Sequence, residues 1–129
     1  MHGYILVVDD KPSNVKLVSF LLTRKGYAVR SAMNADEALD RIAEELPRLI
    51  LMDIQLPGMD GLMLTHKLKV DPRTKHIFIV AFTAYAMKGD KEKMLDAGCD
   101  AYISKPIDTR ALPDKVAEFL AQAEANGGH

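Results

Sequence analysis

Short apolar runs alternate with segments of helical periodicity along the whole chain. Continuous apolar runs predict buried strands at residues 4–8, 49–52 and 77–82, and weaker runs predict strands at 27–30 and 101–103. The segments after these strands have the spacing of amphipathic helices, at 13–25, 35–46, 61–70, 86–96 and 108–123. Five strand–helix units of this kind predict an α/β fold: a (βα)5 doubly wound parallel sheet with right-handed crossovers.

Local signals support several of the predicted helix ends. Asn34 stands before the second helix and Glu37 follows three residues later, which is the pattern of a capping box. Pro113 lies inside the last predicted helix and lacks a backbone N–H, so we expect that helix to become regular only from Leu112 onward. The first helix has more apolar residues than one buried stripe needs, and some of them must be exposed.

Composition fits one ordinary globular domain. The 129 residues carry a net charge of −1, with no basic excess for nucleic acid or for an anionic membrane. There is no membrane-length apolar stretch and no signal peptide, and the single cysteine, Cys99, suits a reducing compartment. We therefore expect a cytoplasmic protein, folded over residues 1–124, with a flexible tail at 125–129. Cys99 is expected to be a buried small hydrophobe.

Polar side chains gather where the predicted strands end. Asp9 and Asp10 follow the first strand, Asp53 follows the third, Thr83 follows the fourth and Lys105 comes shortly after the fifth. The carboxyl ends of parallel strands meet at one edge of the sheet, and ligands of open α/β sheets bind there. The sequence therefore predicts three carboxylates, a hydroxyl and a lysine close together at this edge.

This combination points to phosphoryl chemistry. Carboxylates so close together are costly unless a cation intervenes, and a hard ion such as Mg²⁺ (or Mn²⁺) fits oxygen ligands best. With the ion bound, Asp53 can act as a nucleophile toward a phosphoryl group, while Lys105 and Thr83 hold the phosphoryl oxygens. Each residue alone has an ordinary explanation, such as a helix-capping acid or a surface lysine. Their coincidence at successive strand ends favours a site.

Four stretches carry a resemblance to a known family: ILVVDDKPSN, LILMDIQLPGMDGL, IVAFTAYAM and AYISKPID. Together they resemble the receiver domain of two-component response regulators over nearly the whole chain. The C-terminal stretches look most like single-domain receivers of the bacterial cell-division-regulator type, or receivers attached to hybrid kinases. The resemblance implies a flavodoxin-like sheet with strand order 2-1-3-4-5 and a receiver domain over residues 1–124.

The resemblance also implies how the acidic residues divide their work. Asp53 would be the phosphoacceptor. Asp10 and Asp53 would bind Mg²⁺ directly, the backbone carbonyl of Gln55 would be a third protein ligand, and Asp9 would act through water.

Further roles are implied around the phosphoryl group. Thr83 and Lys105 would contact it, and the small residue Ala84 would let a backbone N–H approach it. Tyr102 matches the aromatic switch residue that moves inward with Thr83. The peptide bond before Pro106 matches one that is usually cis in the family.

The implied partners are proteins: a sensor histidine kinase or histidine phosphotransfer protein as phosphodonor, and a downstream target. Neither nucleic acid nor membrane is expected to bind directly. The expected donor-docking residues are Ser13, Asn14, Leu17, Pro106 and Ile107. The expected output surface consists of Ala86, Met87, Lys91, Met94, Tyr102, Ile107 and Asp108.

Three alternatives remain. A phosphatase or phosphotransferase with an aspartyl nucleophile usually has a second aspartate two residues later, where this chain has Gln55. A binding module that never becomes phosphorylated would not need the complete set of site residues. A nucleotide-binding relative would show a glycine-rich turn after the first strand, and none is present. We therefore expect a signalling domain and not an enzyme.

Overall fold

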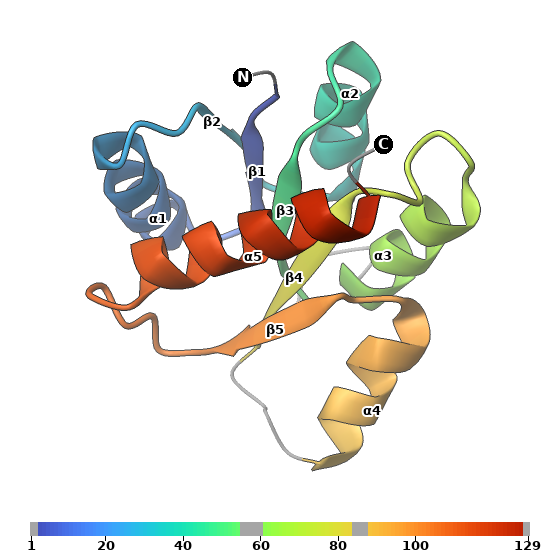
Figure 1. Ribbon diagram of the computed structural model, residues 1–129. Helices are drawn as coiled ribbons and strands as arrows, with labels where there is room; N and C mark the ends of the chain where they lie inside the picture. The colour runs from blue at the N-terminus through green and yellow to red at the C-terminus, as the bar shows by residue number, and fades with distance from the viewer. Residues whose placement is uncertain (1–2, 55–60, 84–87, 128–129) are drawn as a thin grey trace.

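The computed structural model describes residues 3–54, 61–83 and 88–127, in which parallel strands alternate with helices (Figure 1). The strands form one sheet in the order β2-β1-β3-β4-β5, which confirms the predicted fold class and strand order. Within these residues no helix is long and apolar enough to cross a bilayer. In chain order the elements are β1 (Ile5–Val8), α1 (Pro12–Arg24), β2 (Val29–Ala32), α2 (Ala35–Glu44), β3 (Leu49–Asp53), α3 (Gly61–Val70), β4 (Phe78–Thr83), α4 (Lys88–Ala97), β5 (Ala101–Ser104) and α5 (Leu112–Gly127).

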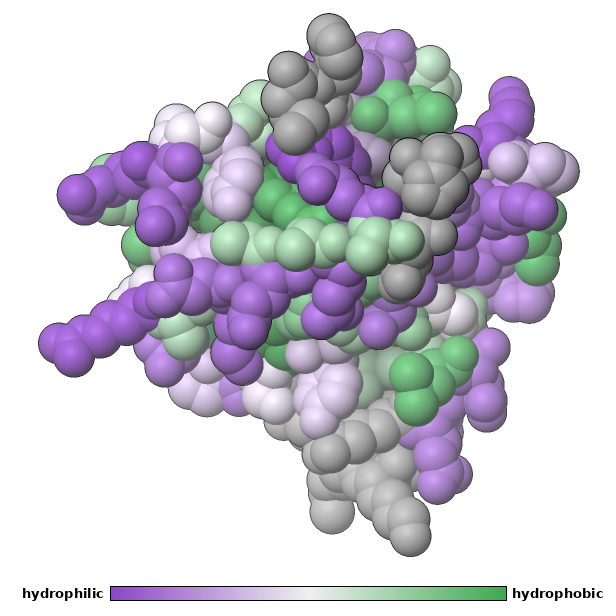
Figure 2. All heavy atoms as spheres, in the orientation of Figure 1, coloured by the Kyte–Doolittle hydropathy of each residue, from purple (hydrophilic) through white to green (hydrophobic). Residues whose placement is uncertain are grey.

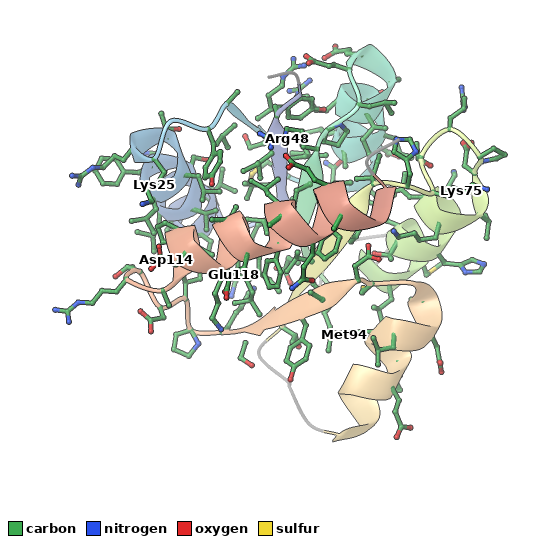
Figure 3. All side chains as sticks on the ribbon, in the orientation of Figure 1. Lys25, Arg48, Lys75, Met94, Asp114 and Glu118 are labelled. Carbon is green, nitrogen blue, oxygen red and sulfur yellow. The ribbon has the colours of Figure 1, made fainter. Side chains whose placement is uncertain are left out.

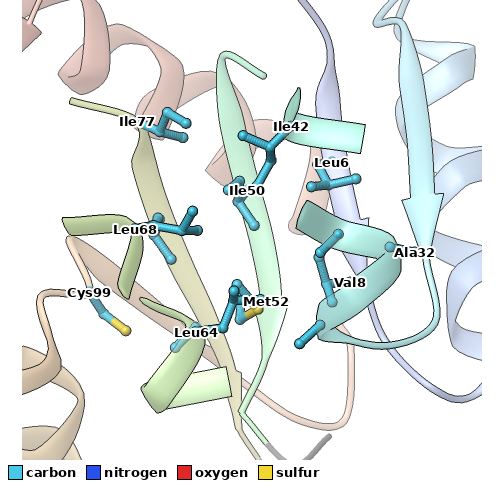
Figure 4. Packing of buried hydrophobic residues seen from close by; sticks show 14 of the residues in the cluster. Leu6, Val8, Ala32, Ile42, Ile50, Met52, Leu64, Leu68, Ile77 and Cys99 are labelled. Carbon is cyan, nitrogen blue, oxygen red and sulfur yellow. The ribbon is translucent and has the colours of Figure 1, made fainter. Parts of the chain in front are cut away.

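The sheet is buried on both faces. Helices α1 and α5 cover one face, and α2, α3 and α4 cover the other (Figure 1). Successive side chains of a strand point to opposite faces, so Leu6 and Val8 pack under α2 and α3 while Ile5 and Val7 pack under α1 and α5. Figure 4 shows the first of these clusters. Burial of each such side chain contributes about 1.5–3 kcal/mol to the stability of the fold. The three central strands are therefore held firmly, and so are the residues at their ends.

The register of the sheet brings the strand ends to one edge. Val8 of β1 is opposite Met52 of β3, so the residue after β1 lies beside Asp53. Asp53 is opposite Phe82 of β4, and the next residue of β4, Thr83, is opposite Ser104 of β5. Because β1 and β3 are neighbours while the chain between them visits β2, this edge includes the topological switch point where α/β ligands bind.

The predicted position of the second strand was wrong by two residues. It was predicted at 27–30 but runs from Val29 to Ala32. The cause is the end of α1, where Gly26 has a positive φ of 94° and its N–H donates to the carbonyl of Thr23. The N–H of Tyr27 donates to the carbonyl of Leu22, a Schellman ending that uses the residue which the prediction placed in the strand.

Two other helix ends also differ from the expected ones. Helix α2 ends at Glu44, before the predicted 46, and the Tyr4 hydroxyl donates to the carbonyls of Arg41 and Glu45 at this end. Leu46, which the prediction placed in the apolar stripe of this helix, is exposed beyond it. Helix α5 becomes regular at Leu112, as predicted, and continues to residue 127, beyond the expected end at 123.

The predicted cap of α2 by Asn34 is confirmed, while Glu37 bonds back to the residue before the cap and not to the cap itself. The backbone N–H of Glu37 donates to Asn34 Oδ1 at 2.8 Å, and the Glu37 carboxylate accepts the N–H of Met33 at 2.9 Å. Cys99 is buried as expected and packs in the cluster under α3 and α4. Burial raises the pKa of its thiol.

Candidate functional site

Three carboxylates converge at the carboxyl edge of the sheet. Oxygens of Asp9, Asp10 and Asp53 lie within 4.8 Å of one another. Asp9 and Asp53 are buried, at 4% and 2% relative exposure, and Asp10 is half-buried at the rim. The sequence placed these acids at two neighbouring strand ends, and the structure brings them together.

The backbone fixes two of these acids. Asp53 is the last residue of the central strand β3, and its position is set by pairing with β4. Asp9 follows β1, where its own N–H donates to the carbonyl of Ala32 at 3.1 Å and so continues the ladder with β2. The main chain of neither acid can move far without disturbing the core strands.

Lys105 reaches this cluster from the far side of β4. Its Nζ lies 3.1 Å from Asp53 Oδ2 and 3.9 Å from Asp9 Oδ2. The Lys105 N–H donates to the carbonyl of Thr83 at 2.7 Å, which extends the β4–β5 ladder by one residue and directs the chain past the site. Thr83 is itself buried at the end of β4. The peptide bond between Lys105 and Pro106 is cis, as the resemblance implied.

The electrostatic balance of the cluster is negative. Burial raises the pKa of Asp9, the charge of Asp53 raises it further, and the Lys11 N–H, Lys105 and Asn14 lower it. Among the residues that the structure describes, one lysine faces three carboxylates, two of which are buried. A divalent cation would offset this excess, and a set of carboxylate oxygens is what Mg²⁺ prefers. The donor atoms present thus fit such an ion.

The start of α3 packs directly on the end of β3. Gly61 is its first residue, and its N–H donates to the carbonyl of Ile54 at 3.0 Å. A Cβ at this position would overlap the carbonyl oxygen of Asp53 and the Cα of Ile54. The sequence identified Gly61 only as the first residue of a predicted helix. A single sequence does not show that two backbone segments approach each other there.

Asn14, which the sequence assigned to the donor-docking surface, is half-buried in the structure, and its side-chain Nδ2 donates to Asp9 Oδ2 at 3.3 Å. The neighbouring Ser13 and Leu17 are exposed on α1, and so is Phe20, which the sequence did not select. Arg24 lies over the Phe20 ring, 5.5 Å from its centroid.

The expected output surface is only partly described. Met94 was assigned to it, but this is wrong: the side chain is 1% exposed and packs in the core from α4 (Figure 3). Tyr102, Pro106 and Asp108 are exposed, and Ile107 is half-buried. The expected residues Gln55, Ala84, Ala86 and Met87, and the side chain of Lys91, lie outside the described part of the chain.

Comparison with known proteins identifies the family of this chain. The response regulator receiver domain family matches residues 5–117. The polar-differentiation response regulator DivK of Brucella anthropi is 44% identical over 123 residues, which is 95% of this chain and all of that protein. A CheY-like receiver domain protein of Methanospirillum hungatei superposes with a TM-score of 0.86 at 36% identity, covering 98% of this chain and all of its own.

A further crystal structure, of a putative response regulator from Chloroflexus aurantiacus, has a TM-score of 0.87 at 32% identity, over 94% of this chain and 99% of its own. Family, relatives and fold agree over nearly the whole length, with the acidic cluster at the expected edge. The chain therefore belongs to the response regulator receiver domain family, whose typical role is to accept a phosphoryl group.

Proposed function

We propose that Asp53 is the residue that accepts the phosphoryl group, with Lys105 and a divalent ion offsetting the charge. The observation that carries this assignment is the 3.1 Å approach of Lys105 Nζ to Asp53 Oδ2, beside two further carboxylates. Asp53 is held by the central strand, so its carboxylate can be aligned with the incoming phosphorus atom. Lys105 then stabilises the negative charge on the transferred phosphoryl oxygens.

Asp10 and Asp53 would bind Mg²⁺ directly, and Asp9 would act on the ion through water. The bound ion would screen the carboxylates from the negatively charged phosphodonor. Thr83 ends β4 next to the Lys105 backbone, and its hydroxyl would donate a hydrogen bond to a phosphoryl oxygen. The resemblance adds Ala84 and the backbone carbonyl of Gln55 to this set. We take residues 1–124 as the receiver domain.

Receiver domains interact with histidine kinases and with downstream targets. Here we propose a sensor histidine kinase or histidine phosphotransfer protein as donor, in the cytoplasm, and a protein target that reads the surface around Tyr102 and α4. Phosphorylation would be the whole of the chemistry, with slow loss of the group to water, so that the chain acts as a signalling domain and not as an enzyme with its own substrate.

Labelling with radioactive acetyl phosphate tests the acceptor. With Mg²⁺ the wild-type chain should take up at most one phosphoryl group, and chelation by EDTA should prevent this. Asp53→Asn should take up none, while Asp40→Asn, an exposed aspartate on α2, should behave as wild type. Labelling retained in Asp53→Asn would refute the assignment, and repeated turnover of phosphate esters would favour the phosphatase alternative.

The outer face of α1 is our candidate for donor docking. Leu17 and Phe20 are 37% and 57% exposed on this helix, which lies beside α5 (Figure 1). Leu17→Glu should slow phosphotransfer from a histidine donor and leave labelling by acetyl phosphate unchanged. Met63→Glu, which makes the same kind of change at an exposed site on α3, serves as the control. Equal loss with both donors would contradict a docking role for Leu17.

A further inference from the structure

The Asp9 carboxylate is held at both of its oxygens. Oδ1 accepts the backbone N–H of Lys11 at 2.9 Å, and Oδ2 accepts the side-chain amide of Asn14 at 3.3 Å. The first donor belongs to the backbone and is present whatever the side chain at residue 11. The second depends on one side chain, in the first turn of α1.

The oxygen that Asn14 holds is also attracted by Lys105. Asp9 Oδ2 lies 3.9 Å from Lys105 Nζ, too far for a hydrogen bond but close enough for strong attraction in a buried place. A carboxylate free to turn toward Lys105 would form a closer ion pair and present fewer oxygens to a cation. The Asn14 amide is hydrogen-bonded to the same oxygen at 3.3 Å, so Asn14 and Lys105 compete for it.

We propose that Asn14 is a positioning residue, which fixes the Asp9 carboxylate in the orientation that a divalent ion requires. The inference rests on the proposed function, since it concerns the same metal site. This role differs from the docking role suggested by the sequence. Loss of a docking residue slows transfer from a protein phosphodonor alone. Loss of a residue that orients a carboxylate of the metal site weakens ion binding, whichever phosphodonor is used. Partners that orient ligands typically change metal affinity by about 10–100-fold.

Binding of Mn²⁺ to the unphosphorylated protein, followed by electron paramagnetic resonance, tests this directly. Asn14→Ala should weaken Mn²⁺ binding about tenfold. Thr23→Ala, which removes an exposed polar side chain from the same helix, should bind Mn²⁺ as wild type does. Thermal melting in EDTA checks that each variant is folded, and Asn14→Ser takes the place of Asn14→Ala if the latter is not.

Phosphorylation provides a second readout. In Asn14→Ala the Mg²⁺ concentration for half-maximal labelling should rise about tenfold with acetyl phosphate and with a histidine donor alike, and the rate at saturating Mg²⁺ should return to within about twofold of wild type. Unchanged Mn²⁺ binding, with slower transfer from the histidine donor alone, would overturn the inference and leave the proposed function standing. Failure of the wild-type chain to bind Mn²⁺ would overturn both.

Discussion

The charged clusters at the two ends of the sheet differ in how their charges are balanced. At the amino ends of β4 and β5, Lys69 Nζ donates to the carbonyls of Lys75 and Ile77 and pairs with Asp100 Oδ2 at 2.8 Å. The same Asp100 oxygen accepts the N–H of Ile79 at 2.8 Å. One base meets one acid here, and backbone groups complete the hydrogen bonds. At the carboxyl ends, within the described part of the chain, one lysine faces three carboxylates.

This difference separates stability from function. A cluster whose charges are balanced within the chain has no need of an added ion, and its loss should be felt in folding. A cluster with an excess of negative charge is less stable alone and has free energy to gain from a cation. Substitutions at the two ends should therefore have opposite signatures, and four of them test the contrast, beginning with the largest expected effect.

Lys105→Met removes the cation next to the proposed acceptor. Labelling by acetyl phosphate at saturating Mg²⁺ should slow by about 10²–10³-fold, because the transferred oxygens lose their fixed positive partner. Binding of Mg²⁺ should not weaken, since a competing cation has gone. Lys115→Met, at an exposed position on α5, should label at the wild-type rate. Labelling of Lys105→Met at the wild-type rate would contradict the functional role assigned to the carboxyl end of the sheet.

Lys69→Met tests the opposite end. Chemical denaturation should show a loss of about 2–3 kcal/mol in the free energy of unfolding, since a charged donor and its acceptors are separated. Binding of Mn²⁺ should stay unchanged. Lys67→Met, an exposed lysine on the same helix, should shift stability by less than about 0.5 kcal/mol. If Mn²⁺ affinity fell in Lys69→Met, the two ends would not be separable.

Gly61→Ala tests whether the backbone packing behind Asp53 affects both stability and phosphorylation. The added methyl group has no space against Asp53 and Ile54, so the free energy of unfolding should fall by about 1–3 kcal/mol and labelling should slow as the acceptor is displaced. Gly26→Ala is the matched control. It meets nothing within 4 Å and is strained only by its φ of 94°, so it should lose stability without losing labelling.

Asp9→Asn should have the smallest effect, and it is opposite in sign to the effects of the preceding two substitutions. Burial raises the pKa of Asp9 above its unfolded value, so its proton stabilises the fold at low pH and this contribution is lost as the pH rises through the raised pKa. At neutral pH, in EDTA, Asp9→Asn should therefore melt at a higher temperature than wild type. The gain should disappear below about pH 4, the unfolded value. A lower melting temperature at neutral pH would contradict this cost of the buried charge.

The sequence predicted the sheet and the charged edge because both depend on strong local patterns. The central strands are continuous apolar runs, and the acids stand immediately after two of them. The half-buried edge strand β2 was displaced by two residues, since its mixed pattern does not reveal that Tyr27 is used to end α1.

The remaining differences come from contacts between distant parts of the chain. Met94 resembles the other residues of a sparsely apolar helix, and only packing against the sheet shows that it belongs to the core. Asn14 looks like a polar residue at the start of a helix, and its bond to Asp9 depends on how β1 turns into α1. Gly61 depends on the approach of two backbones. Such roles follow from tertiary geometry and have no signature in a single sequence.

Chemical mapping of the phosphoryl group tests the central claim most directly. The wild-type chain, phosphorylated with acetyl phosphate and Mg²⁺, would be treated with borohydride, which reduces an aspartyl phosphate to homoserine, and then analysed by mass spectrometry of its peptides. The account predicts reduction at residue 53 and none at residues 9 and 10. Homoserine at either of the other two acids, or a reduced site elsewhere in the chain, would contradict it.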